Sequence, residues 1–447
     1  MPKGLSVAVM ALSVMALAAV SAADEMTPAQ RGQQALTTRA FNMATWKTTT
    51  YDDAWKQWGS KDKQPPKNYP QAFMARYGLH PAPYDNGRYP MGVREGSSLL
   101  GKGLTTDCLL CHGGSIAGKT YIGLGNSALD IQAFFEDMSK ANGGKGKTPF
   151  TFSNARGTSE AGGMAVFLLS HRDADLNILL KPIDLDLRDD LCEDVPAWWL
   201  LKKKKTMYHT GSTDARSVRS LMQFMLVPLN MQSTFEKEEH TFKDIQAFLL
   251  SLEAPKYPFP IDRELAVKGE ILFNETCSKC HGTYGEKWTY PNKIVPIDTI
   301  GTDRNRFVGI SAKVGEHYNK TWLGREKGIK SLEPPVGYQA PPLDGIWATA
   351  PYFHNGSVPT VYHVLNSKAR PKIFTRSFET GVNDYDQAKL GWKIDVLQRG
   401  PDPKLPAYER RKVYDTAQPG RGNGGHTFGD HLDGAQRRAV IEYLKTL

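Results

Sequence analysis

Beyond its first 23 residues the chain has no apolar run long enough to cross a bilayer and no low-complexity tract. With 40% hydrophobic and 23% charged residues, the composition excludes a polytopic membrane protein, a collagen-like chain and a disordered chain. The length of 447 residues predicts two domains. Glycine and proline are both frequent, which predicts long loops between helices.

The N-terminus has the pattern of a cleaved secretory signal. Lys3 precedes an uncharged run from Leu5 to Val20, and small residues follow this run. We expect the first 23 residues (1–23) to be a signal peptide that is cleaved after Ala22 or Ala23, with a membrane anchor as the alternative. No cysteine follows the run, which excludes a lipoprotein anchor. The mature chain is therefore predicted to be periplasmic or secreted, without a stable membrane span.

The formal net charge of +9 does not by itself identify a partner. The only dense basic cluster runs from Lys202 to Lys205 and follows an apolar Trp-Trp-Leu-Leu stretch. We expect this cluster to be a solvent-exposed helix end, with a docking patch as the alternative. Nucleic acid is not expected as a partner of an exported chain.

Four of the five cysteines form two pairs, and each pair is followed at once by histidine. The motifs read Cys108-Leu-Leu-Cys111-His112 and Cys277-Ser-Lys-Cys280-His281. Two thiols at this spacing form thioethers with the vinyl groups of haem, and the imidazole that follows then lies under the iron as its proximal ligand. The motifs therefore predict two covalently bound c-type haems, with His112 and His281 as iron ligands.

Zinc is the main alternative for paired cysteines, but zinc ribbons separate their pairs by about 15–20 residues. Here the pairs begin at Cys108 and Cys277 and lie much further apart. A thioredoxin-like dithiol would need neither a histidine after each pair nor two copies. The fifth cysteine, Cys192, lies among acidic residues that raise a thiol pKa, and we expect it to be structural and inert.

The second motif lies in a frame that resembles the class I cytochrome c fold. Residues 266–273 are predicted to form a helix that leads into Cys277, and residues 435–447 form a second predicted helix with one apolar stripe. Gly269 and Phe273, eight and four positions before Cys277, resemble the positions at which that fold crosses its two terminal helices. The departure is a large insertion, because the long segment 282–434 separates the haem motif from the last helix.

A weak internal repeat marks the boundary between the two predicted domains. Residues 245–252 resemble residues 440–447, and a Pro-rich stretch that ends at Pro260 follows the first copy and cannot continue a helix. We therefore expect an N-terminal haem domain over residues 24–260, with a long N-terminal extension before its haem, and a C-terminal haem domain over residues 261–447. The expected fold is mainly α: two cytochrome c-like haem domains with long loops and insertions.

The second axial ligand decides what each iron can do, because two strong ligands make an electron carrier and an open face permits oxygen or peroxide chemistry. The last methionine in the chain is Met231, so a His/Met iron built within the C-terminal domain is excluded. His426 lies between glycines ahead of the last helix and is the preferred second ligand there. His354 is the alternative.

For the first haem the repeat indicates Met231. Since 443 − 426 = 248 − 231 = 17, Met231 precedes Phe248 by the same distance in sequence as His426 precedes Tyr443. His209, His171 and an empty position are the alternatives for this sixth coordination site.

The segment from Ala340 to Thr360, with its core Pro351-Tyr352-Phe353-His354-Asn355-Gly356, resembles the bacterial dihaem cytochrome c peroxidase superfamily, and especially its rubber-oxygenase-like branch. Residues 301–303 and 423–429 are similar to the same branch. The resemblance covers residues 80–447 in outline.

In the ordinary dihaem peroxidases the C-terminal haem is the His/Met electron-entry site, a pattern that the missing downstream methionine contradicts. In the rubber oxygenases the second haem is bis-His and the first is open to oxygen. That resemblance implies His281 and His426 as the bis-His pair, His112 as the only protein ligand of the first haem, and His354 as a packing residue near the second. The chain is much shorter than those oxygenases, so their substrate is not carried over.

Two functions are consistent with these motifs. In the first, the chain is an oxidoreductase whose first haem, held by His112, takes oxygen or peroxide while the second delivers electrons; Tyr208, His209 or Arg219 could line the reactive side. In the second, it is a plain dihaem electron carrier in which Met231 closes the first haem. We favour the oxidoreductase, with a redox protein or a small-molecule oxidant as its partner.

Overall fold

The computed structural model describes residues 26–59, 63–98 and 101–447. The predicted signal peptide lies outside these residues. Helices account for 36% of the structure and strands for 12%, which agrees with the expected mainly α architecture. Among the described residues, no helix is both long and apolar enough to cross a membrane.

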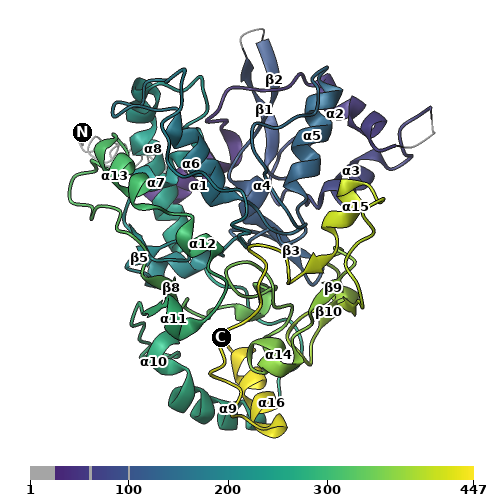
Figure 1. Ribbon diagram of the computed structural model, residues 1–447, viewed down its shortest axis with the longest axis vertical. Helices are drawn as coiled ribbons and strands as arrows, with labels where there is room; N and C mark the ends of the chain where they lie inside the picture. Colours follow the sequence, from purple (N-terminus) through teal and green to yellow (C-terminus); the bar gives the residue numbers. More distant parts are fainter. Residues whose placement is uncertain (1–25, 60–62, 99–100) are drawn as a thin grey trace, which may run out of the picture.

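Eight longer helices form the framework of the described chain (Figure 1). They are α1 (Pro28–Thr38), α3 (Tyr69–Tyr77), α5 (Ile131–Ala141), α6 (Ala161–Ser170), α8 (Gln232–Ser251), α9 (Arg263–Thr276), α13 (Ala312–Lys320) and α16 (Gly434–Leu444). The shorter ones are α2 (Thr49–Asp53), α4 (Leu109–His112), α7 (Val218–Leu221), α10 (Ser278–His281), α11 (Ile297–Ile300), α12 (Asn305–Val308), α14 (Val361–Val364) and α15 (Ala407–Arg411). Short 3₁₀ turns are η1 (Ala54–Gln57), η2 (Trp198–Lys203), η3 (Gln223–Met225), η4 (Ile346–Ala348), η5 (Ser367–Ala369) and η6 (Val382–Asp384).

The strands are short, and each pairs antiparallel with one or two neighbours. The two-stranded ribbons are β1 (Val93–Ser98) with β2 (Gly101–Thr106), β3 (Gly113–Ile116) with β4 (Lys119–Ile122), β5 (Thr206–Met207) with β6 (Thr213–Asp214), β7 (Ile294–Pro296) with β8 (Gly337–Gln339), and β10 (Tyr385–Asp386) with β11 (Gly391–Trp392). A three-stranded sheet has the order β12 (Asp395–Val396), β9 (Ile373–Thr375), β13 (Tyr414–Asp415). In the longest ribbon Val93 lies opposite Thr106.

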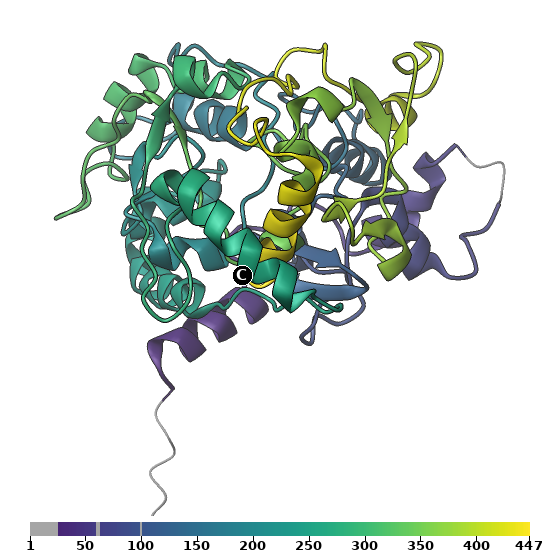
Figure 2. The ribbon, with the colours of Figure 1, turned by 90° about the horizontal axis from the view of Figure 1, so that it is seen from below.

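Two pairs of helices cross in the same way. In the C-terminal half α16 lies across α9, as Figure 2 shows from below, and in the N-terminal half α1 lies against α8. A Cβ atom on Gly269 would overlap the carbonyl of Ala439, and a Cβ atom on Gly32 would overlap the carbonyl of Asp244. Glycine is therefore required at both crossings, because only its missing side chain lets the two backbones approach so closely.

Helix α1 lies in the segment that was expected from the sequence to be an N-terminal extension before the first Cys-x-x-Cys-His motif. Instead of an appendage, α1 takes the place on α8 that α9 takes on α16. The sequence carries a signal for this equivalence, since Arg31-Gly32 matches Lys268-Gly269 as a basic residue followed by glycine at the crossing point.

The hydrophobic cores do not stop at the Pro-rich stretch between the two halves. One cluster joins Trp199 of the N-terminal half to Trp347 and Tyr443 of the C-terminal half. The Trp199 indole N–H donates to the Asp344 carbonyl (2.9 Å), so the ring is both buried and satisfied. A second cluster buries Tyr318 of α13 with residues of α8, and Figure 1 accordingly places α13 beside α7.

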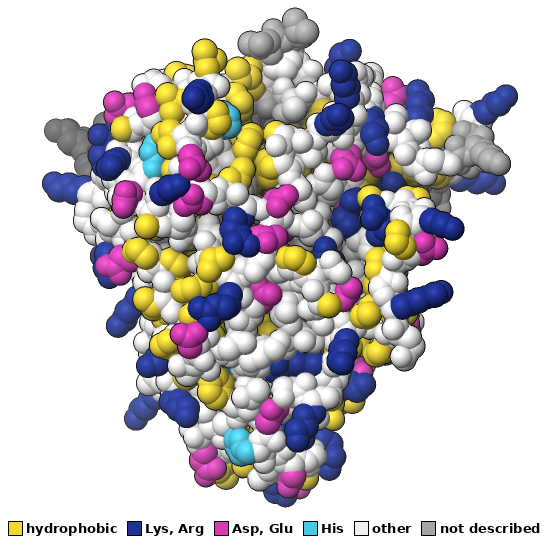
Figure 3. All heavy atoms as spheres, viewed as in Figure 1, with side chains coloured by type: hydrophobic (Ala, Val, Ile, Leu, Met, Phe, Trp, Pro, Cys, Tyr) yellow, Lys and Arg dark blue, Asp and Glu magenta, His cyan; other side chains and the backbone are white. Residues whose placement is uncertain are grey.

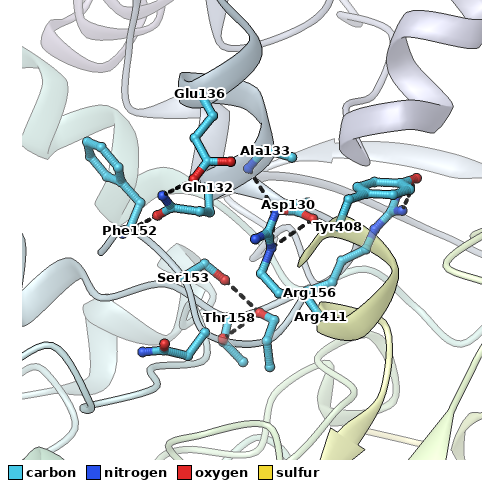
Figure 4. Close-up of polar contacts among 12 residues, drawn as sticks. Asp130, Gln132, Ala133, Glu136, Phe152, Ser153, Arg156, Thr158, Tyr408 and Arg411 are labelled. Carbon is cyan, nitrogen blue, oxygen red and sulfur yellow. Dashed lines mark hydrogen bonds and ion pairs between the residues drawn. The ribbon is translucent and has the colours of Figure 1, made fainter. Parts of the chain in front are cut away.

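A buried ion pair also joins the two halves. The Nε of Arg411 on α15 lies 3.0 Å from an oxygen of Asp130, which caps α5 and is 0% exposed. Arg156 donates to the hydroxyl of Tyr408 on the same short helix (3.0 Å). Figure 4 shows Asp130, Arg156, Tyr408 and Arg411 together in one close-up. Losing either partner of such a pair would leave a buried charge uncompensated.

The lysine cluster is less exposed than its sequence predicts. Lys205 is exposed, but the Lys203 side chain is only 9% exposed and its ammonium lies 2.7 Å from Asp344. The Lys203 ammonium also lies over the rings of Tyr284 and Trp288, which favours burial of a cation. On the face shown in Figure 3, basic and acidic side chains are interspersed.

We predict that Gly269→Ala lowers the free energy of unfolding by about 1–3 kcal/mol, because the added methyl group forces α9 and α16 apart. Gly315→Ala on α13 is the matched control, since its methyl group would meet only Leu332, whose side chain lies 3.3 Å away. Urea unfolding followed by far-UV circular dichroism measures both. Equal effects of the two substitutions would contradict the close crossing.

Candidate haem sites

The first motif begins on a short turn that a buried ion pair holds in place. α4 carries Cys111 and His112 directly after Cys108, and the Asp107 carboxylate accepts a hydrogen bond from the Leu109 N–H (2.7 Å) at the start of the turn. Asp107 also pairs with Arg94, whose guanidinium donates to the Leu36 carbonyl at the end of α1 (3.1 Å). The pair thereby fixes both thiols relative to α1.

His112 is enclosed by the segment 196–198. The Trp198 ring stacks on the imidazole with ring centres 4.5 Å apart. Burial lowers the pKa of His112 to about 4, an effect that the adjacent Pro196 carbonyl opposes. The His112 Nδ1 has no hydrogen-bond partner among the described residues. His112 is therefore a neutral imidazole, the form that binds a metal.

The second motif continues directly from α9. Cys277 ends this helix, α10 carries Cys280 and His281, and the His281 Nδ1 donates to the Pro341 carbonyl (2.8 Å). A backbone acceptor at Nδ1 fixes the tautomer of a metal-binding histidine and leaves Nε2 free for the metal. Burial lowers the pKa of His281, so this imidazole is neutral as well.

Two tyrosines hold the proline segment against the motif. The Tyr284 hydroxyl donates to the His281 carbonyl (3.1 Å) and accepts from the Leu343 N–H (2.6 Å). The Tyr290 hydroxyl donates to the Ala340 carbonyl (2.6 Å). These contacts lie on both sides of Pro341, so the acceptor behind His281 is positioned independently of any metal.

His426 lies across from His281, with 6.3 Å between the ring centres. A metal–imidazole bond is about 2 Å long, so two imidazoles on opposite faces of one metal ion have ring centres roughly 6 Å apart. Burial lowers the pKa of His426 to about 4, and no described residue bonds its Nδ1. Two thiols, a tautomer-fixed imidazole and a second imidazole at this distance fit a bis-His haem c.

The loop that carries His426 is fixed by an arginine. The His426 N–H donates to the Ile300 carbonyl (2.7 Å), and a side chain on Gly425 would overlap the backbone of Gly301. The Arg370 guanidinium donates to the carbonyls of Asn423 and Gly425 (2.7 Å each) and of His426 (3.1 Å). One half-buried side chain thus satisfies three carbonyls of this loop.

The loop before α8 in the N-terminal half is also held by an arginine, but the residue that follows it is partly exposed. Arg172, only 1% exposed, donates to the carbonyls of Leu226 (2.9 Å) and Asn230 (2.8 Å). The next residue, Met231, occupies the N-cap position of α8 without a capping hydrogen bond from its side chain, and it is 41% exposed.

The last helices of the two halves, α8 and α16, also differ in length. Asp244 and Ala439 are equivalent because each meets the glycine of its crossing, so Gly434, the first residue of α16, is equivalent to Glu239 in α8. α8 already starts at Gln232 and is therefore about two turns longer at its N-terminus. These turns carry Met231 roughly 10 Å further along the axis than a loop that folds back, as the one before α16 does.

Two further histidines lie at the contact between the halves. His209 and His354 have ring centres 6.2 Å apart, and the His354 ring stacks on Tyr338 at 4.0 Å. The His209 Nε2 donates to the Asp194 carbonyl (2.8 Å), whereas the buried His354 Nε2 has no hydrogen-bond partner among the described residues. His354 therefore faces His209 and Tyr338, while the ring contacts of His281 are with His426.

The remaining predicted residues have other contacts. His171 ends α6 with its Nδ1 3.0 Å from the Phe167 carbonyl. Arg219 forms an ion pair with Glu239 (2.9 Å) and so joins α7 to α8. The Tyr208 hydroxyl accepts a hydrogen bond from the Gln223 side chain (3.1 Å).

Two features of the sites were not predicted from the sequence, namely the proline carbonyls behind His112 and His281 and the arginines behind the two loops. Pro196 and Pro341 lie far along the chain from His112 and His281, so no local motif joins them. A sequence signal for Pro196 does exist, because the segment around Pro196 resembles the segment around Pro341.

A family model described as RoxA-like, cytochrome c-like matches residues 337–375. The match contains Pro341, which lies behind His281, and His354, which lies beside His209. It also contains Arg370, which holds the loop of His426. It supports a cytochrome c-like domain that carries haem c, a c-type cytochrome oxidoreductase in general, and the resemblance to the rubber-oxygenase-like branch.

Two uncharacterized proteins of Sinorhizobium fredii (strain NBRC 101917 / NGR234) are similar to this chain. Protein y4iM is 33% identical over 241 residues, which cover 44% of this chain and 52% of the relative. Protein y4iJ is 31% identical over 265 residues, which cover 44% of this chain and 41% of the relative. The matched segments thus span about half the length of these relatives or less.

The buried position of Cys192 can be tested by alkylation of its thiol. Its thiol is fully buried, and burial raises its pKa to about 11. Because the thiolate is the reactive form, we predict that iodoacetamide leaves Cys192 unmodified in the folded protein at mildly alkaline pH and modifies it after unfolding in urea. Mass spectrometry of the peptide that contains Cys192 measures both states, and rapid labelling of the folded protein would contradict the prediction.

Proposed function

We propose that the chain is an exported dihaem c-type cytochrome that acts as an oxidoreductase. One haem would bind at Cys108, Cys111 and His112 and keep its second axial face open to oxygen or peroxide. The other would bind at the C-terminal motif with His281 and His426 as a bis-His pair and pass electrons. Its redox partner would be a protein or a small-molecule oxidant.

The difference between α8 and α16 carries this proposal. The loop before α16 sets the His426 ring 6.3 Å from the His281 ring, a spacing that suits one metal ion between them, whereas Met231 at the start of the longer α8 is 41% exposed. An iron with one protein ligand has a vacant coordination site for a small molecule, and an iron with two imidazoles does not. The two sites are therefore suited to different roles.

When bound, the haem supplies the redox chemistry, and the residues of the chain set its surroundings. The Pro341 carbonyl orients His281, and the Arg370 guanidinium holds the loop of His426. Trp198 covers one face of the His112 ring. These contacts position His281, His426 and His112, the residues that would hold the two haems, before any substrate arrives.

A plain dihaem electron carrier is the second candidate, and one observation favours it. Arg172 holds the loop before Met231 as Arg370 holds the loop before His426, so Met231 follows a rigid segment. If this segment presents the thioether to the first haem, both irons are six-coordinate.

Low-temperature electron paramagnetic resonance of the haem-loaded ferric protein separates the two candidates. We expect one high-spin signal from the open haem and one low-spin signal from the bis-His haem. His426→Ala should convert the low-spin signal to high-spin, because it removes one of two strong ligands. Met231→Ala should leave both signals unchanged.

The exposed His431→Ala variant is the matched control for His426→Ala, because it removes a histidine from the same loop region without touching the pair. Two low-spin signals in the wild type, together with a change on Met231→Ala, would contradict the oxidoreductase proposal and support the carrier.

A thiol count tests the number of haems. Four of the five cysteines are expected to be thioethers, so the unfolded protein should show one reactive thiol, and Cys192→Ser should show none. Three reactive thiols in the unfolded wild type would mean that only one motif carries haem.

A further inference from the structure

The segments behind the two haem motifs are copies with one constant offset in residue number. Since 341 − 196 = 354 − 209 = 145, Pro341 corresponds to Pro196 and His354 corresponds to His209. The preceding residues Tyr208 and Phe353 share an unusual backbone, with φ of 67° and 68°. Identical or similar pairs at this offset include Pro196 and Pro341, Leu201 and Ile346, Tyr208 and Phe353, His209 and His354, Gly211 and Gly356, and Ser212 and Ser357.

The two copies bind each other reciprocally. The Asp194 N–H donates to the His354 carbonyl (2.7 Å), and the Gln339 N–H donates to the His209 carbonyl (2.7 Å). Because 339 − 194 is also 145, the two hydrogen bonds join equivalent positions of the two copies. Two histidines that lie far apart in the sequence are thereby fixed with their rings 6.2 Å apart.

The side chains of the two copies differ. The His209 Nε2 donates to the Asp194 carbonyl of its own copy at 2.8 Å. His354 stacks on Tyr338 instead, and its Nε2 makes no corresponding bond to Gln339 within the described part of the chain. His209 alone therefore bonds the other copy through its carbonyl and its own copy through its side chain.

A route of hydrogen bonds and backbone links His281 to the Pro196 carbonyl, and one step across a contact without a hydrogen bond then separates it from His112. From His281 it runs to the Pro341 carbonyl (2.8 Å), along the backbone to Gln339, and to the His209 carbonyl (2.7 Å). It then passes through the His209 side chain to the Asp194 carbonyl (2.8 Å) and along the backbone to Pro196, whose carbonyl lies beside His112.

We propose that His209 is a positioning residue that electronically couples the two haem sites through residues 194–196 and 339–341. One electron passes from the iron on the His281 side, which is oxidised, to the iron on the His112 side, which is reduced. No covalent bond forms or breaks, and no proton has to move along the route. The proposal rests on the proposed function, because it needs a haem at each motif.

The test compares haem-loaded wild type with His209→Leu and His354→Leu. Pulse radiolysis injects single electrons, and the spectra of an open and a bis-His haem report their redistribution over time. We expect His209→Leu to slow the redistribution several-fold, because a side-chain link is lost from the route. His354→Leu removes the equivalent ring but no bond of the route, so it should leave the rate close to that of the wild type.

His209→Gln guards against a merely structural effect, since its amide N–H can still donate to the Asp194 carbonyl and should restore most of the rate. Midpoint potentials and electron paramagnetic resonance signals should stay unchanged in all variants. A wild-type rate in His209→Leu, or an equal loss in His354→Leu, would overturn the coupling route. A failure of the proposed function would instead be visible in the spin states of the wild type.

Discussion

A histidine that binds a metal through Nε2 still carries an N–H group at Nδ1, and in a desolvated site that group needs an acceptor. In the C-terminal half the acceptor is the Pro341 carbonyl at 2.8 Å, and in the N-terminal half the Pro196 carbonyl lies beside His112. A proline is suited to this position because it has no N–H of its own that would have to be satisfied in the same buried place. The segments that supply these carbonyls are therefore fixed against the motifs, and they bring His209 and His354 together where they meet.

The frame around these segments follows from backbone approach and from arginine side chains. Gly32 and Gly269 let two helix pairs cross at carbonyl contact, and Arg172 and Arg370 each satisfy several loop carbonyls. An arginine can do this because its guanidinium presents five donors in a rigid plane. Each half thus combines a close helix crossing with a loop whose carbonyl groups are held by one buried or half-buried arginine.

The sequence alone predicted the elements that depend on local spacing. The short turns of the two Cys-x-x-Cys-His motifs, the helices around 266–273 and 435–447, and Gly269 at a crossing point could be found because each depends on neighbours within about two helical turns. The role of α1 in the first half was missed because this helix ends at Thr38, far along the chain from Cys108. The burial of Lys203 was missed because its partner, Asp344, is distant in the chain, and a run of lysines has no periodicity that indicates such a partner.

The same limit applies to Met231 and His426, the candidate second ligands, and these residues mark where the two halves diverge. The repeat gives Met231 and His426 the same distance in sequence from their helices, but the residues between decide where each side chain goes. Gly434 begins α16 late and leaves residues 427–433 to fold back toward His281. The equivalent residues 232–238 are helical in α8 and carry the chain straight on. A duplicated frame with two different lead-in segments therefore sets a histidine opposite His281 in one half and a half-exposed methionine at the start of a helix in the other.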